Sequence, residues 1–274
     1  IRMVQPSYEY IIGQSHSADS GESVGMSKQL TIGATICEAS SSNTLKLLLL
    51  ADPDIIREDA VLDPIDKQRD KLTSIYVNGD HIGFCRDGYT LAYKYRMARR
   101  SNHIDRLTTI VKELQTRKIY FWCDYGRVIT PFIIVYNNLQ ELDAAIADHV
   151  TSGSKEKIDF KFKQWVKLTH DHIDKLHSGE IDMDNLIEEG IVEYLAPEEI
   201  EKIYCAESYE TFITNIASID HSYTHIAIEQ NIFGLVELSA PNTNHTPATR
   251  ITMFTNQKKQ TCGWFQLNWP YRMD

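Results

Sequence analysis

The chain has 274 residues, of which 42% are hydrophobic and 24% charged, and its formal net charge at pH 7 is −10. This composition is typical of a folded globular protein and excludes an intrinsically disordered chain. The acidic balance argues against a protein that binds nucleic acid alone through a broad basic surface, because such binding needs an excess of Lys and Arg.

The hydrophobic segments and the cysteines indicate in which kind of cellular compartment the chain works. The longest apolar run, 47–51, is far too short to cross a bilayer, and no basic stretch precedes a hydrophobic one at the N-terminus. The five cysteines stand singly, without a C-x-x-C pair, and indicate neither a disulfide framework nor a structural zinc site. We expect a chain that is not secreted, makes no membrane contact and works in a reducing compartment. The first residue, Ile1, and the ending at 272–274 suggest that both ends are cuts.

The first half of the chain changes from loops to regular elements. Residues 5–43 are rich in Ser and Gly and predict mainly loops. An Asn-Gly pair at 78–79 lies between two β-rich runs and predicts a hairpin over 75–84. One long helix is expected over 91–117, because apolar residues recur there at helical spacings. The residues of this stripe are Ile104, Leu107, Ile110, Val111 and Leu114.

The second half of the chain alternates strands with short helices. Asn138 is a candidate N-cap, and Gly190 is suited to end a helix. The predicted elements are, in chain order, strands over 119–123 and 128–135, helices over 139–149, 155–176 and 182–189, and a strand over 223–228. These elements predict an α+β fold, mixed and irregular, with no single sheet running through it.

The C-terminal segment concentrates the basic and aromatic residues of this acidic chain. No Asp or Glu occurs between Leu238 and Met273. The segment contains the cations Arg250, Lys258, Lys259 and Arg272, seven Asn or Gln residues, and the rings of Phe254, Trp264, Phe265, Trp269 and Tyr271. Cations for phosphates, amides for hydrogen bonds and rings for stacking are what a nucleic-acid channel or a nucleotide pocket needs. The alternative is the edge of a folded domain whose acidic residues lie elsewhere.

Residues 241–260 read PNTNHTPATRITMFTNQKKQ. This run resembles the active-centre segment of the second-largest, β-type subunits of multisubunit DNA-directed RNA polymerases. The residues that fall on the spacing of that family are Arg250, Met253, Asn256, Lys259 and Gln260. The ending YRMD at 271–274 is similar to a motif that follows in archaeal and eukaryotic members.

Four further stretches resemble elements of the same family in the same order along the chain. Residues 21–30 look like a degraded part of its fork, and 76–83 like the Val-Asn-Gly hairpin of its external region. Residues 124–131 resemble its Asp-x-Gly-Arg-x-x-Arg-Pro turn, although Thr130 stands where an Arg is usual, and 192–195 resemble a Val-Glu-Tyr element. The resemblance divides the chain into a fork-like segment (1–43), an external-like region (44–220) and an active-centre, hybrid-binding segment (221–274).

The departures of this sequence from the family pattern point to its source. Gln5 replaces the His of the family, and residues 18–21 read Ala-Asp-Ser-Gly where the family has Thr-Pro-Glu-Gly. Such drift is similar to that of a divergent viral polymerase, with the split β-type chains of giant bacteriophages as the best fit. It implies localisation in the host cell cytoplasm, a virus-derived compartment or the virion.

The resemblance implies roles for five residues. Arg250 is the candidate catalytic residue and approaches the triphosphate of the incoming nucleotide, where a guanidinium suits two phosphate oxygens. Asn256 and Gln260 would lie near the growing RNA end, Lys259 would contact phosphate, and His245 would lie nearby. The alternatives are an Arg250 that holds the chain through a salt bridge, amides on an ordinary helix surface and an idle, exposed Lys259.

The resemblance assigns catalytic Mg²⁺ to an aspartate cluster of a β′-type partner subunit, so this chain alone is expected to bind no metal and to be inactive. Asp182-Met183-Asp184 is the nearest local acidic group and is read instead as a helix start. The expected partners are β′-type subunits, another β-type chain, template DNA, RNA product and nucleoside triphosphates.

Two other functions compete with this one. The first is a non-enzymatic viral assembly or interaction module, whose acidic body binds proteins and whose acid-free end binds nucleic acid. The second is a metal-dependent hydrolase built on His221 and His225, although the Glu of the zinc-hydrolase motif is missing. The histidines at 170, 172 and 177 are explained by a solvated helix face, with metal binding as the alternative.

Overall fold

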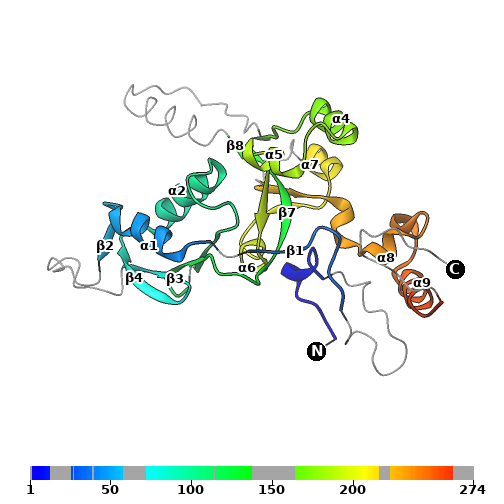
Figure 1. Ribbon diagram of the computed structural model, residues 1–274, viewed down its shortest axis with the longest axis horizontal. Coiled ribbons are helices and arrows are strands. Elements are labelled where there is room, and N and C mark those ends of the chain that lie inside the picture. The colour runs from blue at the N-terminus through cyan, green and yellow to red at the C-terminus, as the bar shows by residue number, and fades with distance from the viewer. Residues whose placement is uncertain are drawn as a thin grey trace, which may run out of the picture. The chain divides into compact units, whose positions relative to one another are not determined.

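The computed structural model describes residues 2–12, 26, 28–38, 40–57, 72–113, 115–137, 164–215 and 223–261. The chain forms two compact units, the larger over 35–229 and the smaller from 1–34 together with 230–274 (Figure 1). Within the smaller unit the backbone N–H of Ile32 donates to the carbonyl of Phe233 at 2.8 Å. The N-terminal and C-terminal parts of the chain therefore come together in the smaller unit.

The first sheet of the larger unit has five strands in the order β2-β4-β3-β6-β5. Its strands are β2 (Ile55–Arg57), β3 (Thr73–Val77), β4 (Asp80–Cys85), β5 (Thr109–Glu113) and β6 (Lys118–Trp122), and its helices are α1 (Ser42–Ala51) and α2 (Gly88–Arg100). Strands β3 and β6 pair in parallel, and the other pairs are antiparallel. The inward side chains of the sheet, such as Ile75, Ile110 and Phe121, form one core with Leu49 of α1 and Leu91 of α2.

The second sheet of the larger unit is centred on β7 (Val128–Ile134). Its other strands are β1 (Thr35–Ile36), β10 (Val192–Leu195), β11 (Cys205–Ala206) and β12 (His225–Ala227). Strand β7 pairs antiparallel with β1, β10 and β12, and β11 pairs in parallel with β12. A two-stranded sheet, β8 (Tyr136–Asn137) with β9 (Gln164–Trp165), follows β7. The short helices of this part are α4 (His170–Ser178), α5 (Met183–Glu188), α6 (Pro197–Ile200) and α7 (Tyr209–Asn215).

The smaller unit is built from short turns and helices in the part that the structure describes. Its elements are the 3-10 turns η1 (Pro6–Tyr8), η5 (Glu229–Ile232) and η6 (Thr243–His245) and the helices α8 (Leu235–Leu238) and α9 (Ala248–Thr261). Together with the sheets of the larger unit, they confirm the predicted α+β fold. None of the described helices is long and apolar enough to cross a bilayer.

The predicted hairpin and turns are confirmed. Strands β3 and β4 flank Asn78 and Gly79, whose φ angles of 50° and 93° suit a turn that follows the twist of the strands. Gly126, with φ 84°, lies in the turn between β6 and β7, although those two strands belong to different sheets. Helix α5 ends before Gly190, whose φ is 69°, as the sequence predicts.

The prediction of one helix over 91–117 is wrong. Helix α2 begins earlier, where the Asp87 side chain accepts hydrogen bonds from the first turn, and it ends at Arg100. The chain then turns through Asn102, whose φ is 57°, and residues 109–113 form β5. Thr109, Ile110 and Val111 are all buried β-branched residues, which fit a strand with both faces covered better than a helix.

The prediction of a helix over 155–176 is wrong at 164–169 and confirmed at 170–176. Trp165 belongs to β9 and stacks on Tyr136 of β8, with ring centroids 5.0 Å apart. Helix α4 starts only after Thr169 and ends at Gly179, whose φ is 76°. Residues 155–163, the predicted helix 139–149 and its cap Asn138 lie outside the described residues.

Candidate functional site

Helix α9 carries four of the five residues expected at the functional site. Arg250 lies in the first turn with an exposed side chain, and Asn256 is half-buried further along. The backbone of Lys259 and Gln260 lies in the last turns of α9, and their side chains are outside the described part. His245 is exposed in η6, just before α9. The structure therefore places four of these residues on one helix and the fifth in the turn that leads into it.

One side of α9 is anchored in the smaller unit and the other is open. Ile251 and Thr255, one turn apart, are buried, with exposed fractions of 4% and 0%. Arg250, Met253 and Gln257 follow each other at spacings of three and four residues and are exposed. The open side of α9 therefore presents a cation, a thioether and an amide in one row.

Spacing along α9 separates the roles that the expected residues could have. Position 260 lies near the row of Arg250 but about 15 Å further along the axis, from the rise per residue of an α-helix. Position 259 falls on the opposite side of the helix from Arg250, since each residue turns the helix by about 100°. Arg250 and Gln260 could therefore bind different parts of an extended ligand, but not the same phosphate.

The chain that leads into α9 is held by buried polar contacts. The Thr243 hydroxyl, buried in η6, lies 2.8 Å from the carbonyl oxygens of both Glu237 and Ala240. The Glu237 carboxylate, itself buried in α8, accepts from the backbone N–H of Gly234 at 3.0 Å. These contacts fix the turn, where Asn242 adopts a positive φ of 55°, and so fix the start of α9.

A buried network of charged groups joins the two sheets of the larger unit. The Arg99 guanidinium of α2 lies 3.0 Å from the Glu199 carboxylate of α6 and 3.1 Å from the Glu193 carboxylate of β10. The Arg100 guanidinium binds the other Glu193 oxygen at 2.6 Å, and Nε2 of His225 in β12 lies 2.5 Å from it. The charges of Arg99 and Arg100 therefore balance those of Glu193 and Glu199, next to the His225 ring.

Burial, the neighbouring charges and the hydrogen bonds together determine the protonation states of Glu193 and His225. Burial raises the pKa of Glu193, but Arg100 and Arg99 outweigh it and hold that pKa well below its ordinary value. Burial lowers the pKa of His225, which is therefore neutral at pH 7. Because Glu193 only accepts, we assign the ring proton to Nε2.

These bonds make the His225 network structural rather than metal-binding. Sequence reasoning gave Glu193 no such role, although a charged residue inside the apolar strand 191–195 is a signal for a buried ion pair. His221, the predicted partner of His225, lies outside the described residues. In the described ranges, no three His, Cys, Asp or Glu side chains are grouped so that they could hold a metal ion. Asp182 stands at the N-cap position of α5, as expected, although its side chain makes no capping hydrogen bond.

The turn at 124–131 is held by Arg127. Its guanidinium donates to the carbonyl oxygens of Asp124 and Leu107 at 2.9 and 3.0 Å and contacts the Thr109 hydroxyl. The Thr130 side chain is fully buried in β7, and no described residue forms a hydrogen bond with its hydroxyl. Arg127 therefore connects the second sheet to β5, the edge strand of the first sheet.

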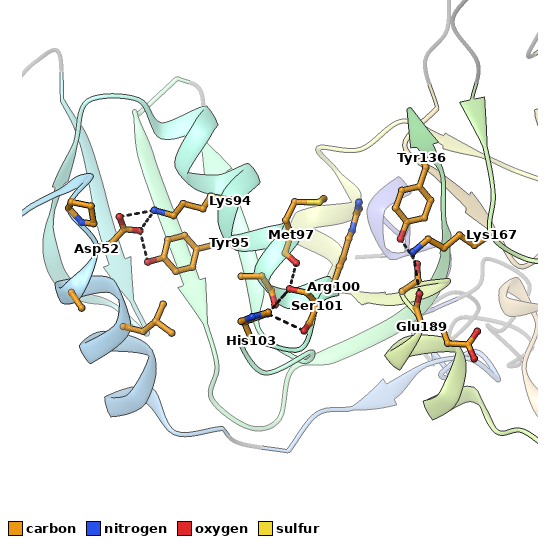
Figure 2. Close-up of a pocket in the computed structure, with 15 residues that line it drawn as sticks. Asp52, Lys94, Tyr95, Met97, Arg100, Ser101, His103, Tyr136, Lys167 and Glu189 are labelled. Carbon is orange, nitrogen blue, oxygen red and sulfur yellow. Dashed lines mark hydrogen bonds and ion pairs between the residues drawn. The ribbon is translucent and has the colours of Figure 1, made fainter. Parts of the chain in front are cut away.

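A groove of about 740 Å³ opens on the larger unit and is drawn in Figure 2. On one wall, Nζ of Lys94 lies 2.8 Å from the Asp52 carboxylate, which also accepts from the Tyr95 hydroxyl at 3.0 Å (Figure 2). On the other wall, the Tyr136 hydroxyl donates to the Gly190 carbonyl at 2.6 Å. Burial raises the pKa of Asp52, but the bonds from Lys94, Asp54 and Tyr95 bring it below its ordinary value. The Lys94 and Asp52 charges neutralise each other, so they form no acid–base pair poised near neutral pH.

Comparison with known proteins gives a consistent family. Residues 75–136, which run from β3 to β8, match the family model of RNA polymerase Rpb2, domain 4. The chain is 27% identical over 262 residues to the DNA-directed RNA polymerase II subunit RPB2 of Encephalitozoon cuniculi, covering 93% of this chain and 20% of that protein. It is 30% identical over 208 residues to subunit Rpo2 of Saccharolobus solfataricus, covering 74% of this chain and 16% of that protein.

A third relative spans the whole chain. The DNA-directed RNA polymerase III subunit RPC2 of Saccharomyces cerevisiae is 27% identical over 277 residues, covering 100% of this chain and 20% of that protein. The chain thus spans a fifth or less of the length of these relatives. Relatives from three different polymerases align with most or all of it, and the chain therefore belongs to the Rpb2-like family of second-largest RNA polymerase subunits.

Proposed function

We propose that this chain acts in an assembled DNA-directed RNA polymerase, where it contributes to binding the incoming nucleotide and the RNA–DNA hybrid. The observation that carries the proposal is the alignment with an RNA polymerase II subunit over 93% of the chain. The exposed row on α9, headed by Arg250, supports it with suitable chemistry. The non-enzymatic assembly module has no comparable support.

The chemistry proposed for Arg250 is electrostatic. A guanidinium at the exposed start of α9 can bind two phosphate oxygens of a nucleoside triphosphate and offset charge that develops on the leaving pyrophosphate. The first turn of α9 carries no acidic residue, so the positive end of the helix dipole adds to this attraction. Asn256 and Gln260 would contact the growing RNA end, and Lys259 would contact a phosphate. His245 would lie close to the bound nucleotide or RNA.

The metal ion and the partners are part of the same proposal. Mg²⁺ would be held by aspartates of a β′-type subunit and would stabilise the attacking and leaving oxygens of the transfer. No step is assigned to a metal on this chain, which alone would be inactive. The further partners are another β-type chain, template DNA and the RNA product. A viral source stays a prediction.

The experiment that tests the proposal measures nucleotide addition by the assembled polymerase carrying Arg250→Ala. We expect assembly to be unchanged and extension of a primed RNA to slow by about 100-fold, the usual cost of removing one donor to a developing negative charge. Arg250→Lys should recover part of the loss, because it keeps the charge but not the two-oxygen geometry.

A matched control is Thr249→Ala, which changes the exposed neighbour on the same turn of α9. It should extend RNA at the wild-type rate. If the Arg250→Ala complex also extended RNA at the wild-type rate and nucleotide affinity, the role of Arg250 would be wrong. Extension by the chain without partners would contradict the assignment of the metal to a β′-type subunit.

A further inference from the structure

A second groove lies on the larger unit, away from the groove of Figure 2 and with no residue in common with it. It has a volume of about 820 Å³ and lies between α2, β5 and the loop that follows α6. We call it the tyrosine groove and define it by Tyr89, Tyr93, Arg96, Lys112, Lys202 and Tyr204.

Three exposed rings wall the tyrosine groove. Tyr89 and Tyr93 lie one turn apart on α2, with exposed fractions of 62% and 51%, and Tyr204 in the loop is 68% exposed. Tyrosine combines a flat apolar ring with a polar tip, and three of them around one hollow are more than scattered surface residues. Such rings are suited to stack on other flat groups.

Two of the three cations that define the groove have no carboxylate in direct contact among the described residues. Arg96 follows Tyr93 on the same face of α2, and its guanidinium donates to the Ile110 carbonyl at 3.3 Å. Nζ of Lys112 lies over the Tyr89 ring. Within the described ranges, neither Arg96 nor Lys112 makes an ion pair with a carboxylate, and Glu201 pairs with Lys202 at 3.6 Å.

The environment of Arg96 and Lys112 favours an anion. Burial lowers the pKa of each by more than the nearby carboxylates raise it, which are Glu199 and Glu193 for Arg96 and Asp87 for Lys112, so both cations are partly stripped of water. Other basic side chains of α2 are paired: Lys94, Arg99 and Arg100 each form an ion pair with a carboxylate. In a chain of net charge −10, two cations without carboxylate partners in a ring-walled hollow mark a local site for negative charge.

We propose that the tyrosine groove binds a single strand of nucleic acid, with bases stacked on the tyrosines and a phosphate held between Arg96 and Lys112. Rings for bases and cations for the backbone are the two requirements of single-strand binding, and this groove meets both. A carboxylate-rich peptide would neutralise the cations but would leave three rings without flat partners. The site is separate from Arg250 and goes beyond nucleotide addition.

The test uses the full 274-residue chain and a fluorescein-labelled decathymidylate, with binding followed by fluorescence anisotropy at low salt. Tyr93→Ala and Lys112→Glu should each weaken binding by about tenfold, the scale of one lost stacking or phosphate contact. Tyr93→Phe and Lys112→Arg should bind as the wild type does, because they keep the ring and the charge. Urea unfolding of each variant shows whether the fold is intact.

A control separates this site from bulk charge. Lys175→Glu makes the same charge change on the exposed face of α4 and should not weaken binding. The proposal would be overturned if the wild type failed to bind, or if Lys175→Glu weakened binding as much as Lys112→Glu. It would also be overturned if polyglutamate displaced the oligonucleotide at lower concentration than unlabelled decathymidylate, which would indicate an acidic protein partner.

Discussion

Nε2 of His225 lies 2.5 Å from Oε1 of Glu193, and both side chains are buried, with residue exposures of 4% each. The same carboxylate receives the guanidinium groups of Arg99 and Arg100. Three side chains from two elements, α2 and β12, therefore meet on one carboxylate in the larger unit, and the stability of that unit should depend strongly on Glu193.

Replacing the Glu193 carboxylate by an amide should destabilise the chain strongly. Glu193→Gln leaves Arg99 and Arg100 with one buried counter-charge fewer, and breaking a buried pair in this way costs about 3–5 kcal/mol. Urea unfolding followed by circular dichroism measures the loss. Glu201→Gln, whose carboxylate side chain is 64% exposed, is the matched control and should change the free energy of unfolding by less than about 0.5 kcal/mol. A similar loss in both variants would contradict the role given to Glu193.

The stability of the chain should fall as the pH is lowered from neutrality. Burial lowers the pKa of folded His225 below its ordinary 6.5, so the unfolded chain binds the proton more readily. The free energy of unfolding should therefore drop once the pH passes below about 6.5, by at most about 1.4 kcal/mol per pH unit for this group.

The measurement for this pH dependence is urea unfolding at several pH values between 5 and 8. His225→Gln should have a smaller slope against pH than the wild type over that range. An unchanged slope in the variant would show that other groups cause the dependence. Glu193 acts in the same direction at lower pH, because its lowered pKa adds stability that is lost as the pH falls through the folded-state value.

Thr130→Val should stabilise the chain. The Thr130 hydroxyl is fully buried without a hydrogen-bond partner among the described residues, and burying such a group costs about 1–3 kcal/mol. Valine has nearly the same shape without that cost and favours a strand. A higher midpoint of thermal unfolding is the expected outcome, with Thr130→Ser as the control that keeps the hydroxyl. A lower midpoint for Thr130→Val than for Thr130→Ser would show that the hydroxyl has a partner.

Gly83→Ala should disrupt the pairing of β2 with β4. A Cβ at Gly83 would lie 2.3 Å from the backbone carbonyl oxygen of Ile56, so one strand must move. We expect a loss of about 1–3 kcal/mol in the free energy of unfolding, the usual cost of overpacking. Gly179→Asn is the control, because Gly179 ends α4 in open space at φ 76°, where Asn is tolerated. Equal losses would contradict the steric argument.

The elements that could be predicted are those fixed by local chemistry. Asn78-Gly79 determines a turn by its own backbone preference, and Gly190 ends α5 in the same way. The prediction over 91–117 failed because Ile104 and Leu107 match a helical period but lie in a turn. The pairing of β5 with β6, which decides the outcome, is a tertiary contact that no local period reveals.

The same distinction applies to the candidate functional residues: local sequence indicates some of them, and only the tertiary structure brings the others together. Arg250 could be proposed as a site residue because its neighbours on α9 form a contiguous sequence pattern. The network around Glu193 and the tyrosine groove were missed, since their members come from separate elements, such as α2 and the loop at Tyr204. The closeness of Arg99 to Glu193 depends on sheet topology, and a single sequence gives little sign of it.

The order of the strands also affects how the chain folds during synthesis. The first sheet uses residues 55–122 and can form early, but the second waits for β12, which pairs with β7. Arg99 is separated from Glu193 by 94 residues, so its charge stays hydrated until that later segment has left the ribosome. The ion network can therefore close only in a late step of folding, and a chain released before β12 would keep an open edge on β7.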